Sequence, residues 1–155
     1  MTYSIRSFLL GLAATVGIVV TAHAELGDND RATYRQAYVA ARANQWDQVW
    51  LLTKNAHDQF PAKLLLWVEL MRCGPEVRFE QIRDFLMTNP DWPGRMTMRR
   101  HAEQMLKDQN DATAAEWFKS FPPISTVGQI RQADLMIAGG HAAQGIALLR
   151  EVWIN

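Results

Sequence analysis

Carboxyl side chains are the groups of this sequence that could do acid–base chemistry, and their positions argue against that role. Glycoside cleavage, for example, usually needs a carboxylic acid whose pKa is raised in a cleft. Asp47, Glu80 and Asp111 lie instead at expected helix starts, where the helix dipole favours the charged form. Glu103 follows two arginines, whose positive charge also favours ionisation. We therefore expect no catalytic residue in this chain.

Arg95, Arg99 and Arg100 form the densest basic cluster of the sequence. Arg95 and Arg99 are four positions apart and would share one helix face. Arginine binds carboxylates bidentately, so one interpretation is that the cluster contacts carboxylate groups of a substrate. The alternative is a solvated helix face on which the arginines pair with Glu103. The tryptophan and tyrosine side chains also have two interpretations: they could stack on sugar rings or pack in the core between helices. Their helical spacing favours the core.

Neither a nucleophile nor a metal site is evident. Cys73 is the only cysteine, and it closes an apolar stretch just before Gly74, so we expect a small buried core residue. His57, His101 and His141 are scattered, and the zinc pattern His-Glu-x-x-His, the glycine-rich phosphate loop and the Gly-x-Ser-x-Gly elbow do not occur. We expect no metal and no cofactor. The 16 basic and 16 acidic residues balance, which gives no reason to expect a nucleic-acid partner.

The first 24 residues have the order of a cleaved secretory signal. Arg6 precedes an apolar run from Phe8 to Val20, and the small residues Ala22 and Ala24 follow at the positions that a signal peptidase reads. The run is shorter than the roughly 20 residues that a membrane span needs. We predict a signal peptide over residues 1–24, cleavage after Ala24, a periplasmic protein and no stable membrane insertion after cleavage; an uncleaved anchor is the alternative.

Residues 25–155 predict an all-α domain of about eight helices. Apolar residues recur at helical spacing between breaks made by glycine, proline and asparagine, and no segment alternates with period two. The expected boundary signals are Asp30 and Asn44 as caps, Pro61 in a first turn, Gly74-Pro75 after a helix end, Asn110 or Asp111 as a start, Thr126 with Gln129 as a capping box, and Gly139-Gly140 as an end.

Segments that begin at Asn44, Val77, Asn110 and Gly140 are alike and recur every 30 to 33 residues. Such a period is typical of tetratricopeptide-like helical repeats, although the full tetratricopeptide pattern is absent. We therefore expect four αα-hairpins stacked into an α-superhelical solenoid arc, because each hairpin buries one face only against its neighbours.

One segment resembles a known family. Phe85 to Gly94, which contains Asn89-Pro90-Asp91-Trp92-Pro93-Gly94, and then Met98-Arg99-Arg100-His101-Ala102-Glu103, are similar to a stretch of soluble lytic murein transglycosylases. Trp117-Phe118 with Pro122-Pro123, and Gly139-Gly140 to Trp153, resemble the parts that follow in that family.

That resemblance implies a ring-shaped or horseshoe α-superhelical domain in the periplasm. In the family this domain precedes a lysozyme-like domain that cleaves the MurNAc–GlcNAc bond of peptidoglycan without water and leaves a 1,6-anhydro end. The family's catalytic Glu-Ser motif and its Gly-Leu-Met-Gln-type motif do not occur here, so no catalytic residue carries over. The resemblance thus implies the non-catalytic N-terminal scaffold of such an enzyme, truncated before the catalytic domain, with peptidoglycan as the partner of the whole enzyme.

The competing hypothesis is a free-standing periplasmic helical-repeat adaptor that binds a protein. The last expected helix bears on both hypotheses, because it is apolar on more than one side. Its apolar residues are Ile146, Leu148, Leu149, Val152 and Trp153. An inner repeat has this pattern because it packs on both sides. We therefore expect either self-association through this helix or packing against a C-terminal domain that is missing here.

Overall fold

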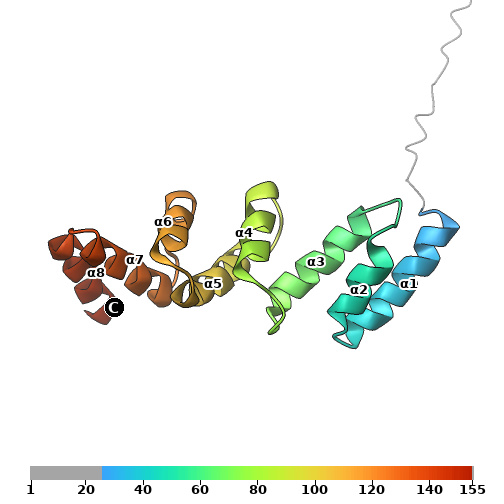
Figure 1. The fold of residues 1–155 in the computed structure, drawn as a ribbon, viewed down its shortest axis with the longest axis horizontal. Coiled ribbons are helices and arrows are strands. Elements are labelled where there is room, and N and C mark those ends of the chain that lie inside the picture. Colours follow the sequence, from blue (N-terminus) through green and yellow to red (C-terminus); the bar gives the residue numbers. More distant parts are fainter. Residues whose placement is uncertain (1–25, 155) are drawn as a thin grey trace, which may run out of the picture.

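The computed structural model describes residues 26–154, and all of their regular structure is helical. The prediction of an all-α fold with about eight helices is therefore confirmed for this part of the chain (Figure 1). The helices are α1 (Asp28–Arg42), α2 (Trp46–Thr53), α3 (Phe60–Arg72), α4 (Phe79–Thr88), α5 (Arg95–Met105), the 3-10 helix η1 (Leu106–Asp108), α6 (Asp111–Ser120), α7 (Thr126–Ala138) and α8 (Ala142–Ile154). The expected signal peptide, with Ala22 and Ala24, lies outside the described residues.

The helices follow one another along the long axis of the molecule, from α1 at one end to α8 at the other (Figure 1). α1 packs on α3, α3 on α5 and α5 on α7, which forms a continuous row of odd-numbered helices. α4 and α6 stand on the same side of this row (Figure 1). The even-numbered helices begin at Trp46, Phe79, Asp111 and Ala142, close to where the sequence repeat places them.

Only two of the four expected hairpins pack as hairpins. α1 and α2 lie along each other, and so do α7 and α8, whereas α4 packs chiefly on α5, and α6 on α7. The expectation of four equivalent αα-hairpins was wrong for these two middle pairs. The connectors that follow α3 and α5 direct the next helix away from the one it follows, so each middle even helix packs mainly against the helix after it.

Two apolar clusters hold the row together. The larger one joins α3 to α6 around the fully buried side chains of Leu70, Ile82, Met98 and Leu106. The smaller one joins α1, α2 and the start of α3 around Ala37 and Val49. Helix α8 buries only Gly145. The C-terminal hairpin is therefore the least covered part of the described chain.

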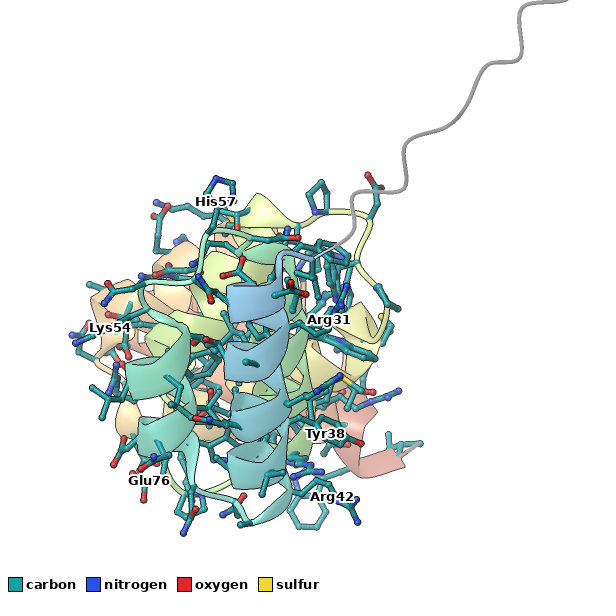
Figure 2. The ribbon with its side chains drawn as sticks, turned by 90° about the vertical axis from the view of Figure 1, so that its right-hand side faces the viewer. Arg31, Tyr38, Arg42, Lys54, His57 and Glu76 are labelled. Carbon is teal, nitrogen blue, oxygen red and sulfur yellow. The ribbon has the colours of Figure 1, made fainter. Side chains whose placement is uncertain are left out.

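The predicted cap at Asp30 was wrong because a tertiary contact uses the same side chain. Asp30 lies inside the first turn of α1 and accepts hydrogen bonds from the backbone N–H groups of His57 (3.1 Å) and Asp58 (2.7 Å). These bonds lower the pKa of Asp30. Figure 2 looks onto α1 from the end of the molecule and shows His57 near the start of that helix. The pairing fixes the loop before α3 against α1.

The other boundary signals met mixed outcomes. Asn44 has φ 58°, and its side-chain oxygen accepts the indole N–H of Trp46 (2.9 Å) instead of capping α2. The cap of α7 is Ser125, one residue before the expected Thr126. Asn110 caps α6, as one of the two alternatives predicted. Pro61 lies in the first turn of α3, as predicted.

Candidate functional site

The segment that resembles the transglycosylase family connects α4 to α5, and Arg95, the residue that follows Gly94, binds the end of α4. The Arg95 guanidinium donates to the backbone carbonyls of Leu86 and Asn89, both at 2.7 Å. These carbonyls belong to the last turn and the C-cap of α4, where no intrahelical donor is available. Arg95 is therefore already occupied in holding α4 and α5 together.

The connector itself packs onto α3 and α4. The ring of Trp92 meets Phe85 edge-on with 5.6 Å between ring centroids, lies 6.2 Å from the ring of Phe60, and carries the Lys63 ammonium 4.5 Å above it. The indole N–H of Trp67 donates to the carbonyl of Pro93 (3.0 Å). Pro90, Asp91 and Pro93 are exposed. The tryptophan of the motif thus packs against side chains of α3 and α4.

Gly94 ends the connector in a conformation that favours glycine. Its φ is +77°, and a Cβ there would lie 2.6 Å from Sδ of Met71 and 3.3 Å from Nε1 of Trp67. Both the backbone and the space therefore require glycine at the start of α5. The close approach brings α5 directly onto the end of α3.

The structure separates the three arginines of the predicted substrate-binding cluster. Arg99 donates to the carbonyl of Pro122, and its guanidinium lies over the ring of Phe121 at 5.6 Å. Arg95 and Arg99 therefore each hold a segment that follows or precedes α5. Arg100 is exposed. Of the three, Arg100 is the arginine whose charge faces solvent.

Glu103 does not pair with these arginines, so the expected local ion pair was wrong. The Glu103 side chain is fully buried, and its carboxylate accepts the backbone N–H groups of Ile124 and Ser125, each at 2.8 Å, and the hydroxyl of Ser125. The same hydroxyl caps α7 by accepting the N–H of Gly128. The Glu103 carboxylate thus lies at the N-terminal end of α7, where backbone N–H groups have no partner within the helix.

Gly128 makes room for this buried carboxylate. A Cβ at Gly128 would lie 2.4 Å from Oε2 and 2.6 Å from Cδ of Glu103. The two residues are 25 positions apart in sequence, so no local pattern links them. Together they join α5 to the first turn of α7.

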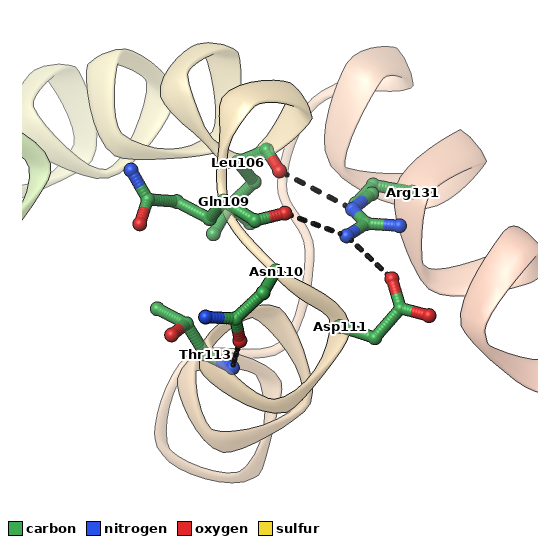
Figure 3. Close-up of polar contacts among 6 residues, drawn as sticks. All are labelled: Leu106, Gln109, Asn110, Asp111, Thr113 and Arg131. Carbon is green, nitrogen blue, oxygen red and sulfur yellow. Dashed lines mark hydrogen bonds and ion pairs between the residues drawn. The ribbon is translucent and has the colours of Figure 1, made fainter.

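Arg131 makes a second contact between α7 and the helices before it, here with η1 and the start of α6 (Figure 3). Its guanidinium, on α7, donates to the carbonyls of Leu106 (3.2 Å) and Gln109 (2.9 Å) and to the Asp111 carboxylate (2.8 Å). These acceptors are the first residue of η1, its C-cap and the first residue of α6, while the Asn110 side chain caps α6 by accepting the Thr113 N–H (2.8 Å). Sequence analysis missed Arg131, because its partners lie about 20 residues away and carry no local signal.

Hollows in the surface lie between helices and contain no grouped catalytic side chains. The groove between α4 and α6 has a volume of about 510 Å³, an apolar floor of Trp117 and Phe121, and a charged rim that includes Asp84 and Glu116. A smaller apolar pocket of about 270 Å³ lies between α1 and α3 beside Tyr34 and Tyr38. Figure 2 shows Tyr38 on the same side of α1 as Arg31 and Arg42. Neither hollow brings an acid and a base together.

Glu69 is a buried acid that sequence analysis did not single out. It is 3% exposed, lies on α3, and accepts a hydrogen bond from the side chain of Trp50 on α2. Within the described residues, its Oε2 atom is buried and has no hydrogen-bond partner. Burial raises the pKa of Glu69 against the smaller opposing effect of the Trp50 bond. Glu69 does not line either of the two hollows described above. Its expected effect is therefore on the stability of the fold.

Replacing Glu69 by glutamine is expected to stabilise the protein at pH 7 and to have little effect near pH 4. Because its folded-state pKa is raised, the folded protein keeps a proton that the unfolded chain releases, so stability falls as the pH rises through this interval. Glutamine keeps the shape and removes the buried charge. Thermal unfolding followed by circular dichroism at both pH values measures the difference. Glu116→Gln, at an exposed position on α6 that does not contribute to the Glu69 shift, should change the melting temperature equally little at both.

Cys73 is a free thiol that is partly buried, and not fully buried as predicted. It adopts φ 50° at the C-terminal end of α3, so the left-handed position expected near Gly74 falls on the cysteine. Burial raises the pKa of the Cys73 thiol, which lowers the thiolate fraction and hence its reactivity. Among residues 26–154, no group of three or more His, Cys, Asp and Glu side chains is placed to hold a metal ion.

Comparisons with known proteins give no relative of this chain: no family model, curated protein or solved structure matches it. None of the helices in the described segment is both long and apolar enough to cross a membrane.

Proposed function

We propose that this chain is the non-catalytic helical scaffold of a periplasmic lytic transglycosylase that acts on peptidoglycan, and that its helices form a superhelical arc. The observation that carries the proposal is the use made of the motif residues. Trp92, Gly94, Arg99 and Glu103 are motif residues, and they join α3, α4 and α5 to one another and to the segment that leads into α7. The residues that this chain shares with the family motif are therefore residues that hold its helices together.

A scaffold of this kind needs residues that fix successive helices, and the motif supplies them at each joint. Arg95 and Arg99 bind backbone carbonyls on either side of α5, and Glu103 binds the first turn of α7. The row of contacts from α1 through α3 and α5 to α7 is compatible with an arc that continues by the same packing. The proposed arc would hold a catalytic module and present one face to the glycan.

Arg100 is the residue that we propose contacts the peptide-stem carboxylates. It is exposed, whereas Arg95 and Arg99 each bind a carbonyl of the chain. An exposed guanidinium can donate two hydrogen bonds to a carboxylate in bidentate geometry without breaking an existing contact.

The test is sedimentation of the purified chain with peptidoglycan sacculi at low ionic strength. We expect the chain to bind weakly, Arg100→Glu to lower the bound fraction several-fold, and the matched variant Arg35→Glu, which reverses an exposed arginine on α1, to leave it unchanged. We also expect no release of anhydro-muropeptides. Equal loss of binding in both variants would show non-specific charge attraction, and release that depends on one of the chain's own Glu residues would contradict the proposal of a non-catalytic scaffold.

A free-standing adaptor that binds a protein is the second candidate, and the exposed apolar surface of the last hairpin favours it. Trp153 and Ile154 on α8 are 86% and 82% exposed. If the chain shows no affinity for sacculi in the sedimentation experiment, the adaptor becomes the better proposal.

A further inference from the structure

The first and last hairpins of the chain are equivalent residue by residue at an offset of 96 positions. In the turn that connects α1 to α2, the backbone N–H groups of Asn44 and Gln45 donate hydrogen bonds to the carbonyls of Ala41 and Ala40. In the last turn, Gly140 and His141 bond the carbonyls of Ile137 and Met136, which are the positions 96 residues later. Asn44 and Gly140 also share a positive φ, 58° and 86°. The two hairpins thus share the same turn geometry, and α2 and α8 begin at equivalent positions, Trp46 and Ala142.

The helix-to-helix contact inside each hairpin is buried alike. Ala37 and its counterpart Ala133 are both 0% exposed. Val49 and its counterpart Gly145 are both buried, and a Cβ at Gly145 would lie 2.7 Å from the carbonyl oxygen of Ala133. The two hairpins therefore close on themselves in the same way.

A second face differs sharply between the two copies. Tyr34 and Ala41 are 8% and 4% exposed, while their counterparts Ile130 and Ile137 are each 38% exposed, although Ile137 also packs against Gly145 on α8. Trp50 is half-buried, and its counterpart Ile146 is 45% exposed. The positions are apolar in both hairpins, so the sequence provides a surface to cover in each.

In the first hairpin, α3 covers this face. The guanidinium of Arg72 donates to the carbonyl of Ala41 (3.2 Å), and Glu69 accepts the bond from Trp50. Ala62 joins the cluster of α1 and α2, with Leu65 and Val68 packed against it. The occupant of the face is therefore a helix that crosses both members of the hairpin with small and branched apolar side chains.

We propose that the exposed face of α7 and α8, formed by Ile130, Ile137 and Ile146, binds an amphipathic helix of a partner protein that packs across the hairpin as α3 packs across α1 and α2. The chemistry of the partner follows from α3: an alanine near its start and leucine and valine on the same face. This inference stands on the two hairpins alone and does not depend on the proposed function.

The test appends a second copy of residues 60–78 directly after Asn155. At the offset of 96 positions, Asn155 is the counterpart of Gln59, the residue that precedes α3. Tethering gives the probe helix a high effective concentration at the face, so weak docking is detected. We expect the melting temperature to rise by about 5 °C relative to the chain without the extension. The control extension carries Leu65→Lys and Val68→Lys in the appended copy and should give no rise.

Two point variants locate the effect. Ile146→Lys in the extended chain should abolish the rise, and Leu51→Lys, at a position on α2 that is 60% exposed, should leave it intact. No rise with the intact helix, or an equal rise with the control extension, would overturn the proposal. A chain without extension that sediments as a dimer, and that Ile146→Lys converts to a monomer, would also overturn it, because the occupant would then be a second copy.

Discussion

Replacing Glu103 by alanine is expected to lower the free energy of unfolding by about 3 kcal/mol or more. The change leaves the N–H groups of Ile124 and Ser125 without their acceptor, and each unsatisfied buried donor costs about 1–3 kcal/mol. It also removes the acceptor of the hydroxyl that caps α7. Urea unfolding followed by tryptophan fluorescence measures the loss, which is a large share of the ~5–15 kcal/mol typical of a domain.

Glu116→Ala is the matched control, because Glu116 is an exposed acid on a helix and pairs only with Lys119 three residues away. Such surface pairs contribute roughly 0–1 kcal/mol. If Glu103→Ala costs no more than this control, then Glu103 is not the acceptor that holds the start of α7.

The partner residue gives a second, independent measure of the same joint. Gly128→Ala alone should be strongly destabilising, since its Cβ would collide with the Glu103 carboxylate. In the Glu103→Ala background the collision partner is gone, so the added cost of Gly128→Ala should fall well below its cost in the wild type. Additive losses would contradict the contact.

Replacing Trp92 by alanine is expected to cost roughly 2 kcal/mol, less than the ~3–5 kcal/mol typical of a fully buried tryptophan, because the ring is only partly buried. The substitution removes ring contacts with Phe85 and Phe60 and the cation–π contact with Lys63, through which the connector holds α3 and α4. The midpoint of urea unfolding, followed by far-ultraviolet circular dichroism, measures the change.

Trp92→Phe separates ring packing from hydrogen bonding. Among the described residues the buried Nε1 atom of Trp92 has no hydrogen-bond partner, so phenylalanine loses ring volume but no bond and should cost clearly less than alanine. Trp153→Ala, at a side chain that is 86% exposed, should be close to neutral. A Trp92→Ala variant as stable as Trp153→Ala would show that the connector does not hold the layers together.

The sequence predicted the helices well because their boundaries are local. Proline and glycine stop helices through their own backbone properties, and the apolar spacing of Ile82, Phe85 and Leu86 is visible within one segment. The repeat of the even-numbered helices, and the cap at Asn110, followed from the same kind of information.

The sequence failed where a side chain's partner lies far along the chain. Asp30 bonds residues 27 and 28 positions away, and Glu103 bonds residues 21 and 22 positions away, so both were assigned to nearby partners. The predicted arginine cluster divided for the same reason, since the carbonyl of Pro122 engages Arg99 while Arg100 is exposed. Polar side chains at joints between helices carry no periodic signal.

All extensive packing in the described chain joins helices that are neighbours, or next but one, along the sequence. A chain with such local contacts can begin to fold at any hairpin and add the next, and it should fold fast for its size. It can also open from an end without breaking the middle. Backbone amides of α8 should therefore exchange with deuterium sooner than those of α5, whose residues Met98 and Ala102 lie in the main cluster.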